Sequence, residues 1–169
     1  MTDLFEDFEH TAWRLETQRG YASDRLSPSW ERFMRGESFG FNPESSWHAN
    51  VRAQTRQGKR FERVRLVDDP PTEGQRFLMA SGLGNVEAGE DIRNLYRSEA
   101  QRLGLPNDDF WLFDSRTVVK FVIDDHGVTL GVRVLDDPEA VVRACQARDA
   151  AWHHAIATAE FHARVPSSR

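Results

Sequence analysis

The sequence predicts an α/β fold (α+β by stricter definitions): a mixed central sheet of about five to seven strands with helices on both faces. Three observations predict it. Residues 60–154 alternate between strand-like and helix-like patterns, three closely spaced strand patterns lie within residues 110–135, and a helical pattern closes the alternation. The length of 169 residues fits a single domain over 1–169. We expect an N-terminal helical layer over 1–58 and the α/β core over 59–165.

The N-terminal layer is predicted from short amphipathic patterns. Residues 4–8 have helical spacing, whereas residues 13–17 alternate apolar and polar, which is typical of a short strand. A helix begins at Ser27-Pro28, because proline suits the first helical position. A further helix begins at residues 45–46.

The core is predicted as strands and helices in alternation. Its expected strands are residues 61–67, 92–96, 110–113, 117–123 and 129–135. A helix opens at Thr72-Glu73, and the glycines at 82, 84 and 89 make the stretch after it irregular. Residues 124–127, Asp-Asp-His-Gly, predict a hairpin turn.

A long closing helix begins at Pro138, where two aspartates precede the proline. Its apolar positions continue as far as Phe161, so we expect one continuous helix. That helix would place His154 and His162 on the same face, eight residues apart.

Composition limits the classes of function. The net charge of -5 argues against general nucleic-acid binding, which needs a basic surface. Cys145 is the only cysteine, so we expect neither an internal disulfide nor a cysteine-based zinc site. We expect a cytoplasmic location, where thiols stay reduced. The acidic N-terminus predicts no signal peptide, and no apolar run is long enough to span a membrane.

No sequence motif indicates catalysis, a metal site or a bound cofactor. The histidines do not form a His-Glu-x-x-His pattern, and the glycines near residue 84 do not match a phosphate-binding loop. The paired aspartates lie where strands meet turns, where aspartate is favoured for the backbone alone. Asp114 differs because it ends an apolar strand, at a place where α/β folds often hold a site.

Polar residues on predicted core elements are the candidate ligand- or partner-binding residues. We expect a network in which Arg14, Arg63 and Arg93, on adjacent strands, meet Glu16, Asp91 and Asp114. A purely structural salt-bridge network explains the same pattern equally well. The candidates are Arg14, Glu16, Arg63, Arg65, Arg76, Asp91, Arg93 and Asp114.

A basic stretch suggests another surface. Arg52, Arg56 and Arg60 recur every four residues, which places them on one helical stripe, and Arg63 and Arg65 share one face of the following strand. The Arg52–Arg65 stripe could contact DNA directly. A solvated face that pairs with nearby acids is the simpler interpretation.

Several blocks resemble an uncharacterised family of actinobacterial proteins. The blocks include FEDFEHTAWRLETQRGY (residues 5–21) and LDDPEAVVRACQARDAAWHHA (residues 135–155), in the family's order. Members of that family are often encoded beside Xre-type helix-turn-helix regulators. The resemblance therefore implies a helix-turn-helix regulator protein as partner.

The stretch from DFWLFD (residues 109–114) to the closing helix is also distantly similar to a phospholipase D-like half-domain. The catalytic form of that domain needs His-x-Lys, and this chain has no such motif: His126 is followed by Gly127 and Val128. The resemblance thus implies the fold in a non-catalytic use.

These observations favour a non-enzymatic cytoplasmic regulatory or interaction protein that binds a helix-turn-helix transcription regulator or a small ligand. One alternative is a degenerate phosphoesterase- or nuclease-like enzyme that uses Asp114 with His153 or His154. Another is direct DNA binding through the Arg52–Arg65 stripe. A homodimer is compatible with each.

Overall fold

The computed structural model describes residues 3–165, within which seven strands form one mixed sheet in the order β6-β5-β4-β1-β2-β3-β7. The strands are β1 (Thr11–Glu16), β2 (Arg60–Val67), β3 (Asp91–Tyr96), β4 (Phe110–Phe113), β5 (Thr117–Ile123), β6 (Thr129–Leu135) and β7 (Ile156–Ala157). β1, β2 and β3 are parallel, whereas β4 runs antiparallel to β1 and continues into an antiparallel meander. The predicted mixed sheet is confirmed, and its register positions the candidate residues.

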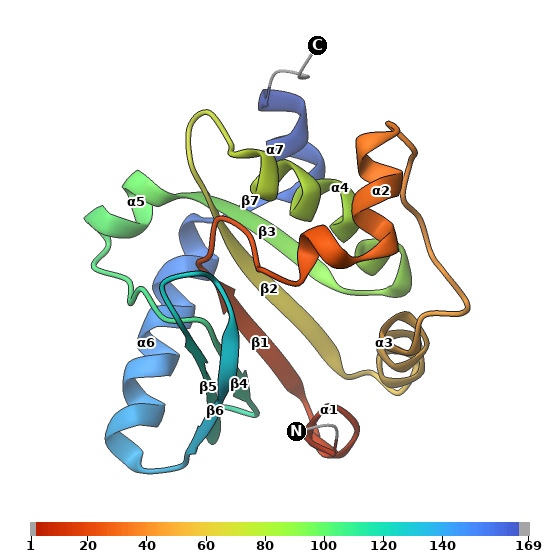
Figure 1. The fold of residues 1–169 in the computed structure, drawn as a ribbon. Coiled ribbons are helices and arrows are strands. Elements are labelled where there is room, and N and C mark those ends of the chain that lie inside the picture. The colour runs from red at the N-terminus through yellow and green to blue at the C-terminus, as the bar shows by residue number, and fades with distance from the viewer. Residues whose placement is uncertain (1–2, 166–169) are drawn as a thin grey trace.

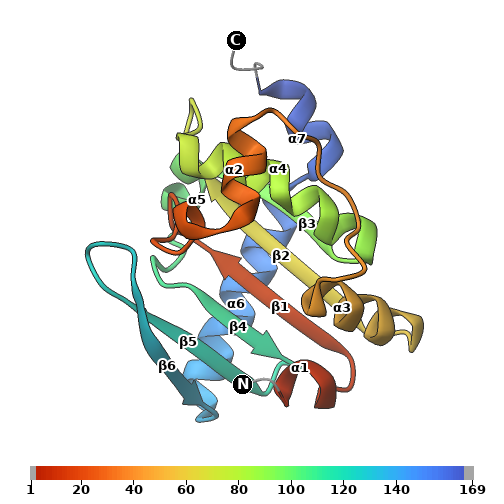
Figure 2. The ribbon, with the colours of Figure 1, turned by 45° about the vertical axis from the view of Figure 1, so that its right-hand side comes forward.

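Helices cover both faces of this sheet, as predicted (Figures 1 and 2). α6 lies on one face, and α2, α3 and α4 lie over the other. The helices are α1 (Leu4–Asp7), α2 (Pro28–Met34), α3 (Ser46–Arg56), α4 (Glu73–Ala88), α5 (Arg97–Arg102), α6 (Pro138–His154) and α7 (Thr158–Arg164), with one 3₁₀ turn, η1 (Asp24–Leu26).

Two apolar layers hold these elements together. Under α6, Trp13, Leu15 and Val64 pack against alanines of the helix. On the opposite face, Phe61 and Trp111 belong to a cluster of aromatic rings that the N-terminal segment completes. β4 is buried on both sides, and its four residues are all apolar.

The segment over 1–58 contributes more than a helical layer. Its short predicted strand is β1, which lies in the middle of the sheet between β2 and β4. Ala12, Trp13 and Leu15 are almost completely buried there. The N-terminal segment and the core therefore share one sheet and one set of packing contacts.

The prediction of an irregular stretch around the glycines at 82 and 84 was wrong, because α4 continues through both. A Cβ atom on Gly84 would lie 2.6 Å from the carbonyl oxygen of Gly40, and one on Gly82 would lie 3.1 Å from Nη1 of Arg65. The glycines are thus explained by close packing against α4. Only Gly89, with a φ of 127°, ends the helix.

The prediction of a single closing helix was also wrong. α6 ends at His154, Ala155 is extended, and the two-residue strand β7 pairs with β3 before α7 begins. The break lets Phe161 pack in a separate buried cluster with Val67 and Met79. His154 and His162 therefore belong to different helices and do not share a helical face.

Within residues 3–165, no helix combines the length and the apolar character needed to cross a membrane.

Candidate binding surfaces

A buried ionic network lies between the sheet and α4. Oε1 of Glu16 accepts a hydrogen bond from Nε of Arg65 at 2.5 Å, and Oε2 accepts one from Nη1 of Arg63 at 2.7 Å. Nε of Arg63 also donates to Oε1 of Glu90 at 2.6 Å. The parallel register pairs Arg14 with Arg63 and Glu16 with Arg65, so alternation places all four side chains on the same face.

Charge in this network is balanced within the protein. Burial alone would raise the pKa of Glu16, but the guanidinium groups of Arg65 and Arg63 outweigh it, and the pKa lies well below its usual value. Burial would lower the pKa of Arg63, and the charges of Glu90 and Glu16 raise it instead. The sequence pattern identified the arginines and Glu16 but not Glu90, which follows α4.

Arg14 extends the network toward the carboxyl ends of the parallel strands. Nη2 of Arg14 lies 3.2 Å from Oδ2 of Asp109, and Oδ1 of Asp109 accepts the backbone N–H of Thr17 at 2.7 Å. The hydroxyl of Tyr21 donates to Oδ2 of the same carboxylate. Asp109, one of the paired aspartates, was interpreted from the sequence as a turn residue. It is instead buried and accepts hydrogen bonds from Thr17, the residue that follows β1.

The carboxyl ends of the parallel strands are where α/β folds commonly hold ligands. Here Asp68 accepts from Nε of Arg97 at 3.0 Å and from Nε of Arg19 at 2.6 Å. Nη2 of Arg97 also donates to the carbonyl oxygen of Thr17 at 2.6 Å. These cations are thus engaged in holding the loops that leave β1, β2 and β3.

Three predicted candidates lie outside the network. Nη2 of Arg93 pairs with Asp91 at 3.2 Å, and the guanidinium covers the ring of Trp152 at 3.7 Å, on the α6 side of the sheet. Arg93 lies opposite Val64 in the register of β2 and β3. Val64 and Arg63 are adjacent along β2 and point to opposite faces, so Arg93 faces away from Arg63. Arg76 lies on α4 and lines a separate pocket with Phe33.

Asp114 also lies outside the network, at the opposite end of the sheet from the carboxyl ends of β1, β2 and β3. Its carboxylate accepts the backbone N–H groups of Glu9, His10 and Thr11 at 2.7–2.9 Å. Burial alone would raise the pKa of Asp114. The three backbone hydrogen bonds outweigh that effect, so the pKa lies below its usual value. Asp114 thus anchors the start of β1.

The enzyme hypothesis requires Asp114 to meet His153 or His154. Asp114 and His153 line one pocket of about 710 Å³. Among the described residues, however, both carboxylate oxygens of Asp114 bond to backbone, and no hydrogen bond joins them to either histidine. The two side chains share a pocket without forming an acid/base pair.

The predicted Arg52–Arg65 stripe does not form one surface. α3 ends at Arg56, and Arg63 and Arg65 are buried beneath α4. The guanidinium of Arg52 lies 3.3 Å above the ring of Phe41. Burial of Arg63 and Arg65 removes the continuous row of cations that DNA contact would need.

β6 is an edge strand of the sheet (Figure 2), at the opposite end of the strand order from β7, and it carries exposed apolar side chains. We call Leu130, Val132 and Val134 the β6 surface; they are 66%, 39% and 62% exposed. Val132 lies opposite Phe121 and Val134 opposite Val119, so both valines point to the face of the sheet away from α6. The sequence marked this segment as a strand but not as exposed.

Residues 3–165 contain no group of three or more histidine, cysteine, aspartate and glutamate side chains arranged to hold a metal ion.

Comparison with known proteins found a matching family and a distantly similar solved structure. Residues 1–163 match the family described as "Domain of unknown function (DUF6879)". No curated protein matches the chain. A solved structure of a phospholipase D family member, Nuc from Salmonella typhimurium, is distantly similar: it aligns with 92% of this chain and 86% of its own at 11% identity, with a TM-score of 0.49.

Proposed function

We propose that this chain, which belongs to the DUF6879 family of unknown function, is a non-enzymatic regulatory protein that binds a partner protein along β6. The observation that carries the proposal is the exposed β6 surface on an edge strand. The internal pairing of other candidate side chains also supports it. Asp114 accepts backbone N–H groups, and Arg63 pairs with Glu16 and Glu90 inside the protein.

Edge strands are usually protected, since their free N–H and C=O groups can pair with another chain. β6 has seven residues, contains no proline and has one charged side chain, Arg133. A register shift at Val122/Ile123 interrupts its pairing with β5 only near its start. The remainder offers an outer edge on which a strand can add.

The surface indicates the chemistry of the partner segment. Strand addition gives affinity through main-chain hydrogen bonds and specificity through alternate side chains. Val132 and Val134 favour apolar residues on one side of the added strand. Arg133 points to the other side, because it is opposite Lys120 in the register, and favours an acidic residue there.

We propose a helix-turn-helix transcription regulator as that partner, in the cytoplasm. Support comes from the resemblance to actinobacterial proteins encoded beside such regulators, and from the net charge of -5, which suits contact with a basic DNA-binding protein better than contact with DNA. The chain would then modulate transcription through the regulator.

The test measures binding of the purified regulator encoded beside the gene, by isothermal titration calorimetry. We expect Val134→Lys to weaken binding at least about tenfold, because a buried interfacial contact becomes a desolvated charge. The matched control is Leu26→Lys, which changes a residue that is 88% exposed and lies on η1. Both variants should unfold at the same denaturant concentration as the unmodified protein.

Equal affinity of Val134→Lys and the unmodified protein would overturn the proposal, as would the absence of any complex with the regulator. If the chain alone is a dimer in light scattering and Val134→Lys makes it a monomer, β6 pairs with a second copy instead.

A further inference from the structure

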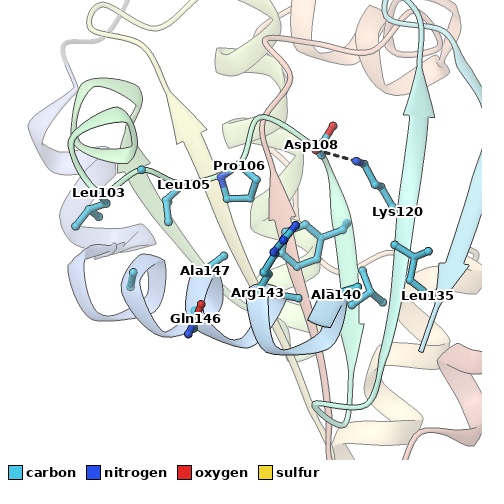
Figure 3. Close-up of a pocket in the computed structure, with 15 residues that line it drawn as sticks. Leu103, Leu105, Pro106, Asp108, Lys120, Leu135, Ala140, Arg143, Gln146 and Ala147 are labelled. Carbon is cyan, nitrogen blue, oxygen red and sulfur yellow. Dashed lines mark ion pairs between the residues drawn. The ribbon is translucent and has the colours of Figure 1, made fainter. Parts of the chain in front are cut away.

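A pocket of about 550 Å³ lies between α6 and the strands β4, β5 and β6 (Figure 3). Its volume falls in the range of roughly 300–1,000 Å³ that is typical of small-molecule sites. We propose that this pocket binds a small organic anion, namely a carboxylate carried on an apolar chain. The proposal is independent of the β6 surface and concerns a different face of the sheet.

The pocket exists because α6 covers the sheet with small side chains. Ala144, Ala147 and Ala151 are its buried residues, and their spacing of three and four places them on one helical face. An alanine side chain ends at Cβ, so the helix does not fill the space above Phe110 and Val118, which line the pocket. Protein interiors are otherwise closely packed, so an apolar space of this size favours an apolar guest.

The apolar lining continues into the neighbouring loop. Leu103, Leu105 and Pro106, in the segment that joins α5 to β4, line one side of the pocket, and Leu135, at the end of β6, lines another (Figure 3). An apolar chain lying along α6 would therefore contact hydrocarbon on the helix, the sheet and the loop. Such contacts provide affinity without any specific hydrogen bond.

Two cations give the pocket its preference for an anion. Nζ of Lys120 on β5 lies 3.0 Å from Oδ2 of Asp108 (Figure 3), and Arg143 on α6 bonds to Glu139. Figure 3 shows Arg143 extending from the helix toward the strands. Asp108 and Glu139 are both exposed, so water can solvate them when a ligand carboxylate takes their place.

The charge pattern thus matches an amphiphilic anion. The apolar body would lie over Phe110, and the carboxylate would reach Lys120 and Arg143 at the rim. A neutral alcohol of the same length would lose the two charge-assisted hydrogen bonds. The carboxylate is therefore expected to bind more tightly than the matching alcohol.

The test compares decanoate with decanol as probes of the full chain, by isothermal titration calorimetry below micellar concentrations. We expect decanoate to bind with a micromolar Kd and decanol to bind about tenfold more weakly. Lys120→Met should reduce this difference, because methionine keeps the apolar stem and removes one of the two charges. Arg116→Met is the matched control, since it removes an exposed cation near Glu9 and outside the pocket.

A second variant tests the cavity itself. Ala147→Leu should fill the space and weaken both probes at least about tenfold, provided that circular dichroism shows the native helical content. If Ala147→Leu does not fold, the Lys120→Met comparison decides alone. The proposal is overturned if decanoate does not bind the unmodified protein, or if decanoate and decanol bind the unmodified protein and Lys120→Met with the same ratio of affinities.

Discussion

Nε of Arg63 lies 2.6 Å from Oε1 of Glu90, and both side chains are buried. Arg63 is in the middle of β2, whereas Glu90 lies in the connection between α4 and β3. The pair therefore joins the helix that covers the sheet to the strands beneath it. Glu16 accepts from the same guanidinium, so removal of Arg63 takes the paired arginine from Glu90 and leaves Glu16 with one arginine fewer.

We predict that Arg63→Ala lowers the free energy of unfolding by about 3–5 kcal/mol, because it leaves uncompensated charge inside the protein. Urea denaturation followed by circular dichroism would measure the loss. The exposed Arg143→Ala should change stability by less than about 0.5 kcal/mol. A loss in Arg63→Ala as small as that expected for Arg143→Ala would mean that Arg63 is not a structural residue.

Asp114→Asn is expected to destabilise the protein by about 1–3 kcal/mol. Asparagine tolerates the positive φ of 52° at this position, but it supplies one acceptor oxygen in place of the two that bind the N–H groups of Glu9, His10 and Thr11. The exposed Asp125→Asn is the control. Equal stability of the two variants in guanidinium titrations would contradict the anchoring role of Asp114.

The depressed pKa of Glu16 predicts sensitivity to acid. A carboxylate with a folded pKa below its unfolded value contributes stability above the unfolded pKa and loses it as the pH falls toward the folded pKa. The free energy of unfolding should therefore decrease below pH 4.5, the ordinary value for glutamate. Urea titrations from about pH 7 to 3 measure this slope. Glu16→Gln should be less stable and have a shallower slope; an unchanged slope would argue against the buried pairing.

His162 predicts a second pH dependence at higher pH. Burial and, secondarily, the charge of Arg65 lower the pKa of His162 below 6.5. The unfolded chain then binds more protons than the folded one, so stability falls as the pH decreases through this region. His162→Gln should reduce the slope between about pH 7 and 5 in thermal unfolding. Identical slopes in the variant and the unmodified protein would refute this.

Gly84→Ala should destabilise the protein by about 1–3 kcal/mol, although alanine favours helix by about 1 kcal/mol. The added Cβ would approach the carbonyl oxygen of Gly40 to 2.6 Å and Cε1 of His48 to 2.7 Å. Gly131→Ala is the control, since nothing lies within 4 Å of a Cβ at that position. Differential scanning calorimetry would compare them, and a stabilised Gly84→Ala would contradict the packing.

Local patterns predicted the core strands well. The predicted strands 110–113, 117–123 and 129–135 coincide with β4, β5 and β6. Each has a clear alternation or apolar run and is bounded by turn residues such as Asp124 and Gly127, which are local signals. The same reasoning failed at Gly82, Gly84 and Ala155, because the contacts that decide those positions come from Gly40, Arg65 and β3.

The candidate sites were predicted only in part. The sequence indicated that Arg63 and Arg65 would share one face and that Arg14 and Arg63 would meet Glu16, and the structure places these four side chains together. Asp91, Arg93 and Asp114 were included on the same argument and lie elsewhere. Position along a strand gives the face of a residue, but the register with neighbouring strands decides which side chains meet.

The sequence by itself therefore determined the class of fold, most strands and the absence of familiar catalytic motifs, since these depend on residues close together in the chain. Only the tertiary structure decided that Arg65 meets Glu16, 49 residues away, and is closed off from solvent. It likewise decided that β6 lies at an edge and that the alanines of α6 leave a pocket. The physical reason is that burial, edge position and cavity volume depend on how distant segments pack, which no local pattern records.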